Sequence, residues 1–395
     1  MIQKLKRNPF FRKLMIMGTG VLSIINRIIP KDNKKILFYD STREFLDDNT
    51  EALFSYMKLL GFDKKYKLVC CVPAQKYISS FDNYVPVGSL KGVIAFLTSK
   101  YVFFSFGDFR IRPSKKQIVV NQWHGTGTKK GGKQLNDSGY KKEKLDNFTY
   151  FIASSETTAP VMAEQFDCPM SKMLIQGSAR NDYLFSGKDC LSLLNINKND
   201  YIKTILWMPT FRNSVDNRFH DGKVVGETQL PIIYEYEDME SFNKFLNEKK
   251  VIVIIKAHPM SNLKNKEYSN IIIINNSDLR SKGVKLYEFI SNFDALITDY
   301  SSVFPDFLLL NRPIGFTMDD YEEYERTRGF FFDDFKNYMP GHHMYNYEDM
   351  TKFINDLVVG KDDYQDARKK VLPVFWKYAD NKNCERLLKT VGISL

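Results

Sequence analysis

Residues Ile118 to Lys130 read IVVNQWHGTGTKK, and this stretch contains the pattern that decides the fold. It opens with a short apolar β-branched run, Ile118 to Val120, which is typical of a buried strand. It then changes abruptly into a polar, glycine-rich loop that carries His124 and ends in Lys129 and Lys130. Open α/β sheets bind ligands where such strands end, so the stretch predicts a strand that leads into a ligand-binding loop.

The residue types in this loop suit an anionic ligand and a proton transfer. Gly125 and Gly127 let the backbone approach a substrate closely. Thr126 and the backbone N–H groups can donate to phosphate oxygens, and His124 can take or release a proton near neutral pH. The alternative is an ordinary junction between strand and loop with a structural histidine.

Three later stretches repeat this pattern of an apolar strand that ends in polar residues. They are Ile205 to Met208 followed by Thr210 and Arg212, Val251 to Ile255 followed by Lys256 and His258, and Ala295 to Thr298 followed by Asp299, Ser301 and Ser302. Four such strand ends in one chain favour a shared ligand site over four separate coincidences.

Ser301 and Ser302 lie directly before an apolar helix that we predict from Val303 onward. The free N–H groups and the dipole at a helix start attract phosphate, and the hydroxyls add further donors. The alternative is a serine that caps the helix, worth about 1 kcal/mol, and both roles can hold together. Lys256 and His258 point to the same side if the strand pleat persists, and a capped strand end is the alternative there.

The composition indicates a globular protein of two domains with an anionic partner. The chain has 395 residues, which is more than one ordinary core requires, and 43% of them are hydrophobic. Its formal net charge of +10 indicates nucleic acid, a phosphate-rich substrate or an acidic membrane surface. Many aromatic residues lie in core-like runs such as Tyr101 to Phe104, which argues against a nucleic-acid binder with exposed stacking rings.

Cysteine and histidine spacing gives no sign of a metal site. The five cysteines fit reduced thiols in a cytosolic protein, and the five histidines are too dispersed for zinc. The sequence also lacks an Asp-x-Asp motif, with which many nucleotide-sugar enzymes hold a divalent metal. We therefore expect neither a metal nor another cofactor.

Residues 1–30 differ from the rest of the chain. Five basic residues lie within the first 13 positions, and the apolar segment Leu14 to Ile29 follows. This segment is too short and too polar to span a bilayer, and it lacks the cleavage site of a signal peptide. It predicts an amphipathic helix on a membrane surface, and the alternative is a helix packed on its own domain or on a neighbouring subunit. The predicted apolar face comprises Phe11, Leu14, Met15, Val21, Leu22, Ile25, Ile28 and Ile29.

From Lys34 onward, predicted strands and helices alternate, which is typical of doubly wound parallel sheets. Strands are predicted at 35–39, 66–72, 101–106, 117–121, 149–153, 173–175, 204–208, 251–255, 271–275, 295–298 and 313–317. Helices are predicted at 47–60, 90–98, 157–166, 239–249, 287–292, 303–311 and 367–388. We therefore expect an α/β protein with two Rossmann-like domains that face a cleft. The expected ranges are 1–30 for the membrane segment, 31–190 and 191–370 for the domains, and 371–395 for a helix that crosses back to the first domain.

Six short motifs occur in a fixed order along the chain. They are Trp123-His124-Gly125-Thr126, Arg180-Asn181-Asp182, Lys256-Ala257-His258-Pro259, Asp299-Tyr300-Ser301-Ser302, Arg328-Gly329-Phe330-Phe331-Phe332-Asp333 and Pro340-Gly341. Together they resemble the teichoic-acid CDP-glycerol glycerophosphotransferase family from about Asn121 to about Glu385. The chain departs from that family at Gly127-Thr128, where Pro-Leu is frequent, and at Ala179 and His342, where proline is frequent.

The resemblance implies a GT-B fold, with 31–190 as the acceptor domain and 191–370 as the CDP-donor domain. It also implies metal-independent transfer of a polyol phosphate to a lipid-linked cell-wall or capsule polymer, with release of CMP. CDP-glycerol is the expected donor, and CDP-ribitol is the alternative. The expected location is the cytoplasmic face of the cell membrane. A glycosyltransferase of the same fold that uses a nucleotide sugar is a further alternative.

Residue roles follow from the same resemblance. His124 would be the general base on the acceptor hydroxyl, and His258 is the competing choice. The donor diphosphate would be held by His258, Lys256, Ser301, Ser302, Arg328, Thr210 and Arg212. Gly125, Thr126, Asp299, Arg180, Asn181 and Asp182 would support the site, and Asp299 would shape the serine loop.

Overall fold

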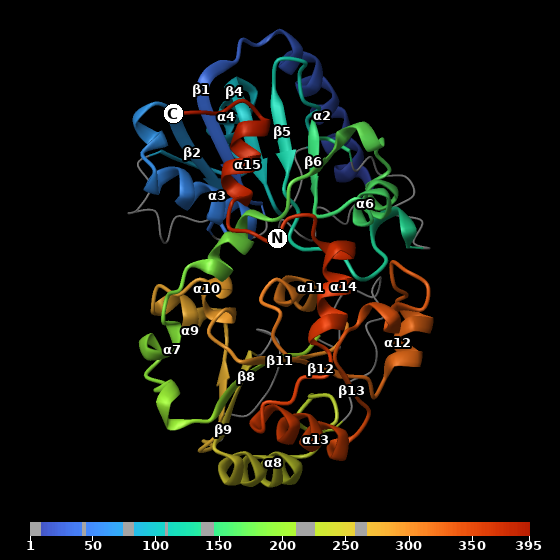
Figure 1. Ribbon diagram of the computed structural model, residues 1–395. Coiled ribbons are helices and arrows are strands. Elements are labelled where there is room, and N and C mark those ends of the chain that lie inside the picture. Colours follow the sequence, from blue (N-terminus) through green and yellow to red (C-terminus); the bar gives the residue numbers. More distant parts are fainter. Residues whose placement is uncertain are drawn as a thin grey trace. The chain divides into compact units, whose positions relative to one another are not determined.

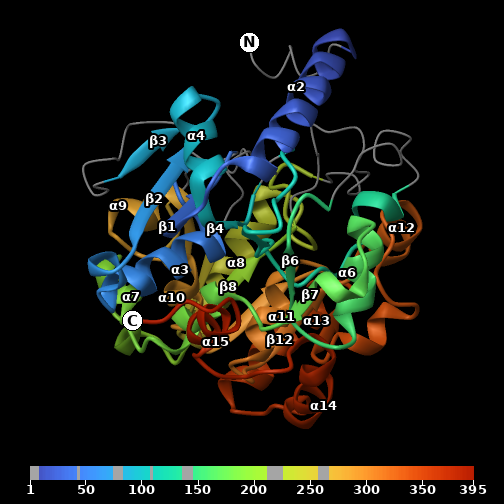
Figure 2. The same cartoon turned by 90° about the horizontal axis from the view of Figure 1, so that it is seen from above.

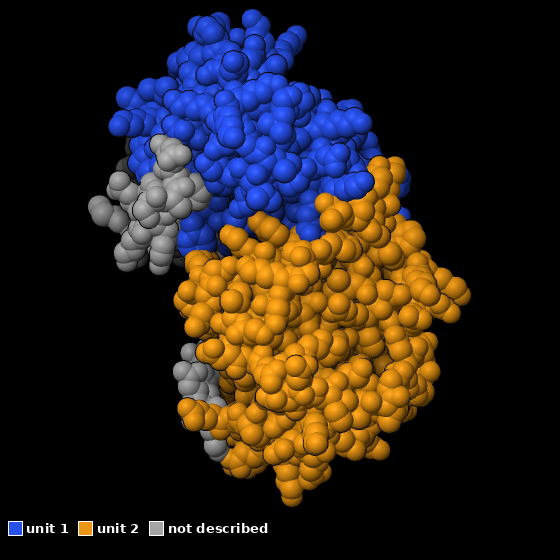
Figure 3. All heavy atoms as spheres, turned by 60° about the vertical axis from the view of Figure 1, so that its left-hand side comes forward, with its two compact units in different colours: residues 1–124, 138–182, 382–395 blue, residues 125–137, 183–381 orange. Residues whose placement is uncertain are grey.

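The computed structural model describes residues 9–41, 45–73, 83–106, 110–135, 146–210, 226–256 and 267–395. These residues form two parallel β-sheets that are accompanied by helices (Figure 1). The chain divides into two compact units, shown in Figure 3: unit 1 contains residues 1–124, 138–182 and 382–395, and unit 2 contains residues 125–137 and 183–381. The predicted α/β class with two parallel sheets is confirmed. Unit 1 includes the C-terminal residues 382–395 and unit 2 includes residues 125–137, so each unit combines separate segments of the chain.

Unit 1 contains a seven-stranded parallel sheet in the order β3-β2-β1-β4-β5-β6-β7. Its strands are β1 (Asp32–Tyr39), β2 (Lys67–Val72), β3 (Tyr84–Pro86), β4 (Ser99–Phe104), β5 (Ile118–Asn121), β6 (Tyr150–Ala153) and β7 (Met173–Ile175). Because all neighbouring strands are parallel, their carboxyl ends meet at one edge of the sheet. The loops that follow β4, β5 and β7 therefore come together at this edge.

Helices cover both faces of this sheet. They are α2 (Pro9–Ile28), α3 (Asp48–Leu59), α4 (Leu90–Thr98), α6 (Thr158–Phe166) and α15 (Asn383–Thr390). Figure 2 shows α2 and α4 on one side of the sheet and α3 and α15 on the other. Double coverage explains why Ile36, Leu37 and Phe38 are all buried in succession instead of alternating with exposed residues. None of the described helices combines the length and the hydropathy that spanning a bilayer requires.

Unit 2 contains a six-stranded parallel sheet in the order β10-β9-β8-β11-β12-β13. Its strands are β8 (Lys203–Met208), β9 (Val251–Lys256), β10 (Ile271–Ile274), β11 (Ala295–Thr298), β12 (Ile314–Thr317) and β13 (His342–Met344). The register pairs Thr298 with Met208 and Trp207 with Ile255. Thr298, Met208 and Lys256 therefore end three neighbouring strands at the same level.

The core of unit 2 has two layers, one on each face of its sheet. The helices are α7 (Cys190–Leu193), α8 (Tyr236–Lys249), α9 (Asn276–Ser281), α10 (Leu286–Ile290), α11 (Val303–Leu308), α12 (Tyr321–Thr327), α13 (Tyr347–Val358) and α14 (Gln365–Phe375). Trp207 belongs to one hydrophobic cluster with Phe242 of α8, and Leu206 belongs to the other with Phe289 of α10. Adjacent residues of β8 enter opposite layers because side chains alternate along a strand.

Short 3-10 helices complete the described elements of both units. They are η1 (Phe62–Lys64), η3 (Gly132–Gln134), η4 (Met170–Lys172), η5 (Ala179–Phe185), η6 (Lys198–Asp200) and η7 (Phe335–Tyr338).

Residues 367–388, predicted to be largely helical, form two helices with a break between them. α14 ends at Phe375, and α15 begins at Asn383. Trp376 takes an extended conformation with φ −133° and ψ 118°, and its indole Nε1 donates to the carbonyl of Pro305 at 2.6 Å. This tertiary bond to a buried indole fixes Trp376 outside the helix.

Candidate functional site

His124 follows β5 at the carboxyl edge of the sheet in unit 1. Its ring stacks on Phe106 with 4.8 Å between the centroids and lies 4.0 Å from the ring of Trp123. Trp123 adopts a left-handed φ of 55° and packs edge-on against Phe166 at 4.7 Å. Packing between aromatic rings therefore sets the orientation of the imidazole.

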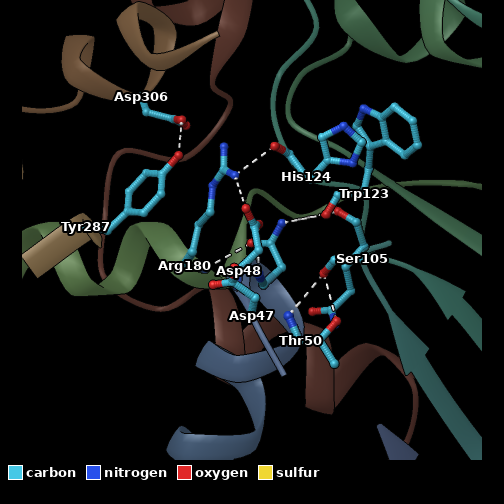
Figure 4. Close-up of polar contacts among 11 residues, drawn as sticks. Asp47, Asp48, Thr50, Ser105, Trp123, His124, Arg180, Tyr287 and Asp306 are labelled. Carbon is cyan, nitrogen blue, oxygen red and sulfur yellow. Dashed lines mark hydrogen bonds and ion pairs between the residues drawn. The ribbon is translucent and has the colours of Figure 1, made fainter. Parts of the chain in front are cut away.

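Two buried side chains hold the backbone on which His124 sits (Figure 4). Nη1 of Arg180 donates to the His124 carbonyl at 2.7 Å and to the Asp48 carboxylate at 2.6 Å. Nδ2 of Asn49 donates to the Trp123 carbonyl at 2.9 Å, and Oδ1 of Asn49 accepts the N–H of Arg180 at 3.0 Å. Arg180 is 4% exposed and Asn49 is 0% exposed, so these hydrogen bonds are shielded from water. They fix the position of the His124 loop.

Asp48 and Asn49 are site residues that the sequence reading missed. They begin α3, where Asp47 caps the helix by accepting the N–H of Asp48 at 2.9 Å. Local sequence therefore explains these acidic and amide residues as helix-start residues. Their partners Trp123 and Arg180 lie 74 and 132 residues further along the chain, which no local pattern reveals.

Asp182, the last residue of the Arg180-Asn181-Asp182 motif, binds the start of the C-terminal helix α15. The carboxylate of Asp182 accepts the N–H groups of Asn383 and Cys384, both at 2.9 Å, and so caps the start of α15. Burial raises the pKa of the Asp182 carboxyl, and these hydrogen bonds oppose the rise. Asn181 is fully buried. The structure thus brings Arg180 to the His124 loop and Asp182 to α15.

In unit 2, Asp299 joins the carboxyl ends of β8 and β11. Its carboxylate accepts the N–H of Thr210 at 2.8 Å, the hydroxyl of Thr210 at 2.5 Å and the N–H of Ser301 at 3.0 Å. Asp299 itself is 0% exposed. The structure therefore brings Thr210, Asp299 and Ser301 together, and Lys256 ends the strand next to β8.

Ser302 directly precedes α11, which has six residues. Its side chain makes no capping hydrogen bond to this helix. A helix of only six residues has a small dipole. The hydroxyls and N–H groups of Ser301 and Ser302 therefore contribute more to binding an anion than the dipole of α11 does.

Arg328 ends α12, and its N–H donates to the carbonyl of Tyr324 at 2.8 Å. Gly329 follows with φ 73°, a conformation that favours glycine. Phe330 then packs against the ring of Tyr300 at 5.4 Å, and Tyr300 lies between Asp299 and Ser301 in the chain. The Arg328 segment is thereby anchored to the loop that carries Ser301.

The loop after His124 belongs to unit 2 and packs within it. The hydroxyl of Thr128 donates to the carbonyl of Tyr300 at 2.9 Å, and the N–H of Phe331 donates to the carbonyl of Thr128 at 3.0 Å. A Cβ at Gly127 would lie 2.3 Å from the ring of Phe331, so the close approach requires glycine. Gly125, with φ 153°, and the buried Thr126 lead into this loop.

Three of the predicted features, His258, Arg212 and Pro340-Gly341, are not among the residues that the structure brings together here. His258 and Arg212 lie outside the described residues. Gly341 lies at the amino edge of the sheet, because a Cβ there would be 2.2 Å from the carbonyl of Ile314, the first residue of β12. Pro340-Gly341 therefore lies at the edge opposite Thr210. Among the described residues, no group of three or more His, Cys, Asp or Glu side chains is arranged to hold a metal ion.

Known proteins are similar to this chain in sequence and in fold. Residues 21–392 match the family described as CDP-Glycerol:Poly(glycerophosphate) glycerophosphotransferase. A teichoic acid poly(glycerol phosphate) polymerase of Bacillus spizizenii is 29% identical, over 84% of this chain and 85% of that protein. The teichoic acid ribitol-phosphate polymerase TarL of Staphylococcus aureus is 23% identical, over 99% of this chain and 68% of that protein. A variant of the wall teichoic acid polymerase TagF soaked with CDPG has a TM-score of 0.75 at 19% identity, over 95% of this chain and 93% of that chain.

Proposed function

Because the chain belongs to the CDP-glycerol:poly(glycerophosphate) glycerophosphotransferase family, we propose that it transfers glycerol phosphate from CDP-glycerol to a hydroxyl of a lipid-linked polymer. Membership makes it a transferase of teichoic-acid biosynthesis. The observation that carries the proposal is the match over residues 21–392, which includes all six motifs. Relatives named for glycerol phosphate and relatives named for ribitol phosphate both match the chain, so the choice of glycerol rests on the description of the family.

The donor diphosphate binds to unit 2 in this proposal. Asp299 orients Thr210 and the N–H of Ser301 at the carboxyl edge of a parallel sheet, where α/β proteins bind ligands. Lysine and arginine next to such hydrogen-bond donors match the charge of a diphosphate. The proposed donor residues are Thr210, Lys256, Ser301, Ser302 and Arg328, together with His258 and Arg212, which lie outside the described residues.

The acceptor hydroxyl loses its proton to His124. This assignment is supported by the position of the imidazole after β5 and by the contacts that fix it, namely the ring of Phe106 and the bond from Arg180 to its carbonyl. An imidazole held in a fixed orientation is well suited to act as a general base on a hydroxyl. The GT-B arrangement, with one cleft shared by acceptor and donor domains, remains part of the proposal.

The reaction is a single displacement at the β-phosphorus of the donor. The acceptor oxygen forms a bond to that phosphorus, and the bond from the phosphorus to the oxygen bridging the two phosphates breaks. CMP leaves with the bridging oxygen, and the proton passes to His124. The cations and N–H groups of unit 2 stabilise the charge that develops on the leaving phosphate, which is the main requirement of phosphoryl transfer.

The identity of the released nucleotide tests this proposal. The chain is incubated with a membrane lipid extract and with CDP-glycerol, CDP-ribitol or a nucleotide sugar in turn. We expect CMP from CDP-glycerol. Release of a nucleoside diphosphate from a nucleotide sugar would identify a glycosyltransferase, and faster release of CMP from CDP-ribitol would assign ribitol phosphate.

The enzyme works at the cytoplasmic face of the membrane in this proposal, and α2 supports such attachment. Asn26 of α2 is buried, and its Nδ2 donates to the carbonyl of Arg112 at 2.9 Å, so a polar residue docks the helix on unit 1. Among the side chains of α2 that the structure describes, the large exposed apolar ones are Val21 at 57%, Ile24 at 64% and Ile28 at 80%. A row of outward aliphatic residues is typical of helices that enter a lipid interface.

The described part of α2 differs in detail from the predicted apolar face. Ile24, which was not assigned to that face, is exposed together with Val21 and Ile28. Leu22, Ile25 and Ile29 are half-buried. The remaining predicted positions Phe11, Leu14 and Met15 lie outside the described side chains.

A further inference from the structure

The segment that carries His124 continues into unit 2 as a short extended stretch. Its residue Lys129 forms an antiparallel bridge with Phe330. The N–H of Lys130 donates to the carbonyl of Gly329 at 3.2 Å, and the N–H of Phe331 donates to the carbonyl of Thr128 at 3.0 Å. Backbone pairing on both sides of Lys129 fixes where its side chain begins.

The side chain of Lys129 ends at the carboxyl edge of the sheet in unit 2. Its Nζ lies 5.0 Å from the centroid of the Tyr324 ring and donates to the hydroxyl of Thr210 at 3.1 Å. Tyr324 is fully buried and Thr210 is bonded twice to Asp299, so both partners of the ammonium are rigid. The ammonium is therefore held next to the ends of β8 and β11.

This is the position at which a diphosphate needs a cation. Asp299 orients both Thr210 and the N–H of Ser301, and Lys256 ends the adjacent strand β9. Lysine binds phosphate as a compact point charge with three rotatable donors, so Nζ can keep its bond to Thr210 while it donates to a phosphate oxygen.

We propose that Lys129 binds the diphosphate of the CDP-activated donor, a role that the sequence motifs did not assign. The inference rests on the proposed function and deepens it. Four residues, Gly125 to Thr128, separate Lys129 from His124. One continuous segment thereby contributes the base for the acceptor and a cation for the donor.

A structural role for Lys129 makes different predictions. As a counter-ion that only stabilises Thr210 and Asp299, Lys129 would affect unfolding and leave ligand affinity unchanged. CDP and CMP separate the two roles, because CDP has the diphosphate and CMP lacks the β-phosphate. Calorimetric binding of both nucleotides to the full chain is measured together with thermal unfolding.

Lys129→Met should lower the affinity for CDP by about ten- to a hundredfold, the range for one charged hydrogen bond, and should lower the affinity for CMP less. Lys129→Gln, which retains a donor for Thr210 without the charge, should lose CDP affinity while keeping its unfolding temperature. Lys129→Arg should keep most of the affinity. Lys130→Met is the matched control, because Lys130 is exposed and its replacement changes the net charge by the same amount. The CDP affinity of Lys130→Met should equal that of the wild type.

The outcomes distinguish this inference from the proposed function. If the wild-type chain binds CDP and both Lys129→Met and Lys129→Gln bind it equally well, the assignment of Lys129 is overturned and the proposed function stands. An equal loss in Lys130→Met would also overturn it, because the effect would then come from net charge. If the wild-type chain binds no CDP, the proposed function itself fails and the inference with it.

Discussion

His124 has a side chain fixed by rings and a backbone fixed by Arg180 and Asn49, so its replacement should affect catalysis more than binding. His124→Gln should lower kcat by about 10²- to 10⁴-fold, because an acceptor hydroxyl needs a positioned base. The wild-type rate should fall on the acid side as the imidazole takes up a proton and ceases to be a base, and the variant should lack this dependence. CDP affinity, measured by calorimetry, should be unchanged.

His258→Gln is the comparison for this experiment, because His258 is the competing candidate for the base. Its CDP affinity should fall, and the acid limb of its rate profile should persist. The reverse result, in which His124→Gln loses donor affinity and His258→Gln loses the acid limb, would exchange the two roles.

Arg180 positions His124 by donating a hydrogen bond to the His124 carbonyl. An experiment can distinguish this positioning role from a contribution to stability. Arg180→Lys keeps the charge near Asp48 but lacks the planar fork that reaches the carboxylate and the carbonyl together. We expect kcat to fall about tenfold or more, from the loss of one charged hydrogen bond, with CDP affinity unchanged.

Lys172→Ala is the control for this variant. It removes another partly buried ion pair of unit 1, from Lys172 to Asp146 at 2.9 Å, which involves neither His124 nor Arg180. The kcat of Lys172→Ala should be that of the wild type. If Arg180→Lys also keeps its kcat while its unfolding temperature falls, Arg180 has a structural role alone.

Among the elements, most strands could be predicted, including the three-residue edge strand β7, whereas the edge strands β3 and β13 could not. Val251 to Ile255 is an unbroken β-branched run that is fully buried, so its sequence alone is sufficient to predict a strand. Strands β3 and β13 have three residues each and lie at sheet edges, and β3 ends in Pro86. Such segments form strands because a neighbour offers hydrogen bonds, which the local sequence does not encode.

The docking of α15 depends on Asp182, which supplies acceptors for two N–H groups at its start. Asp182→Ala leaves these groups without that partner, so the free energy of unfolding should fall by about 1–3 kcal/mol. Asp189→Ala is the control, because Asp189 caps the short α7 at an exposed position and should cost less. Equal unfolding temperatures for Asp182→Ala and the wild type would show that α15 docks without this cap.

The exposed apolar side of α2 can be tested against a similar residue elsewhere. Ile24→Asp with Ile28→Asp should reduce sedimentation with anionic phospholipid vesicles, because the lipid interface no longer gains two aliphatic side chains. Leu59→Asp is the matched control, since Leu59 of α3 is 84% exposed and should have no effect on sedimentation. Unchanged sedimentation of the double variant would refute attachment through this side of α2.

At the scale of the whole molecule, the sequence predicts two parallel β-sheets flanked by helices. It does not predict which unit each segment belongs to. The loop after His124 reads as the end of a strand, and its packing depends on the fit between Gly127 and the ring of Phe331. The C-terminal helix likewise joins unit 1 through Asp182, about 200 residues earlier in the chain. Such long-range pairs have no local periodicity, so the contacts that make Asp48, Asn49 and Lys129 candidate site residues are visible only in the structure.

The cationic character of the chain predicts how the enzyme neutralises its donor. The formal net charge is +10, the sequence has no Asp-x-Asp motif, and Lys129 and Lys256 lie at the carboxyl edge of unit 2. If these cations carry out the neutralisation, CMP release from CDP-glycerol should continue at its full rate in excess EDTA. Raising the salt concentration should instead weaken CDP binding, because ions screen charges beyond about 8 Å at 0.15 M. Loss of activity on chelation that magnesium restores would overturn the metal-independent mechanism.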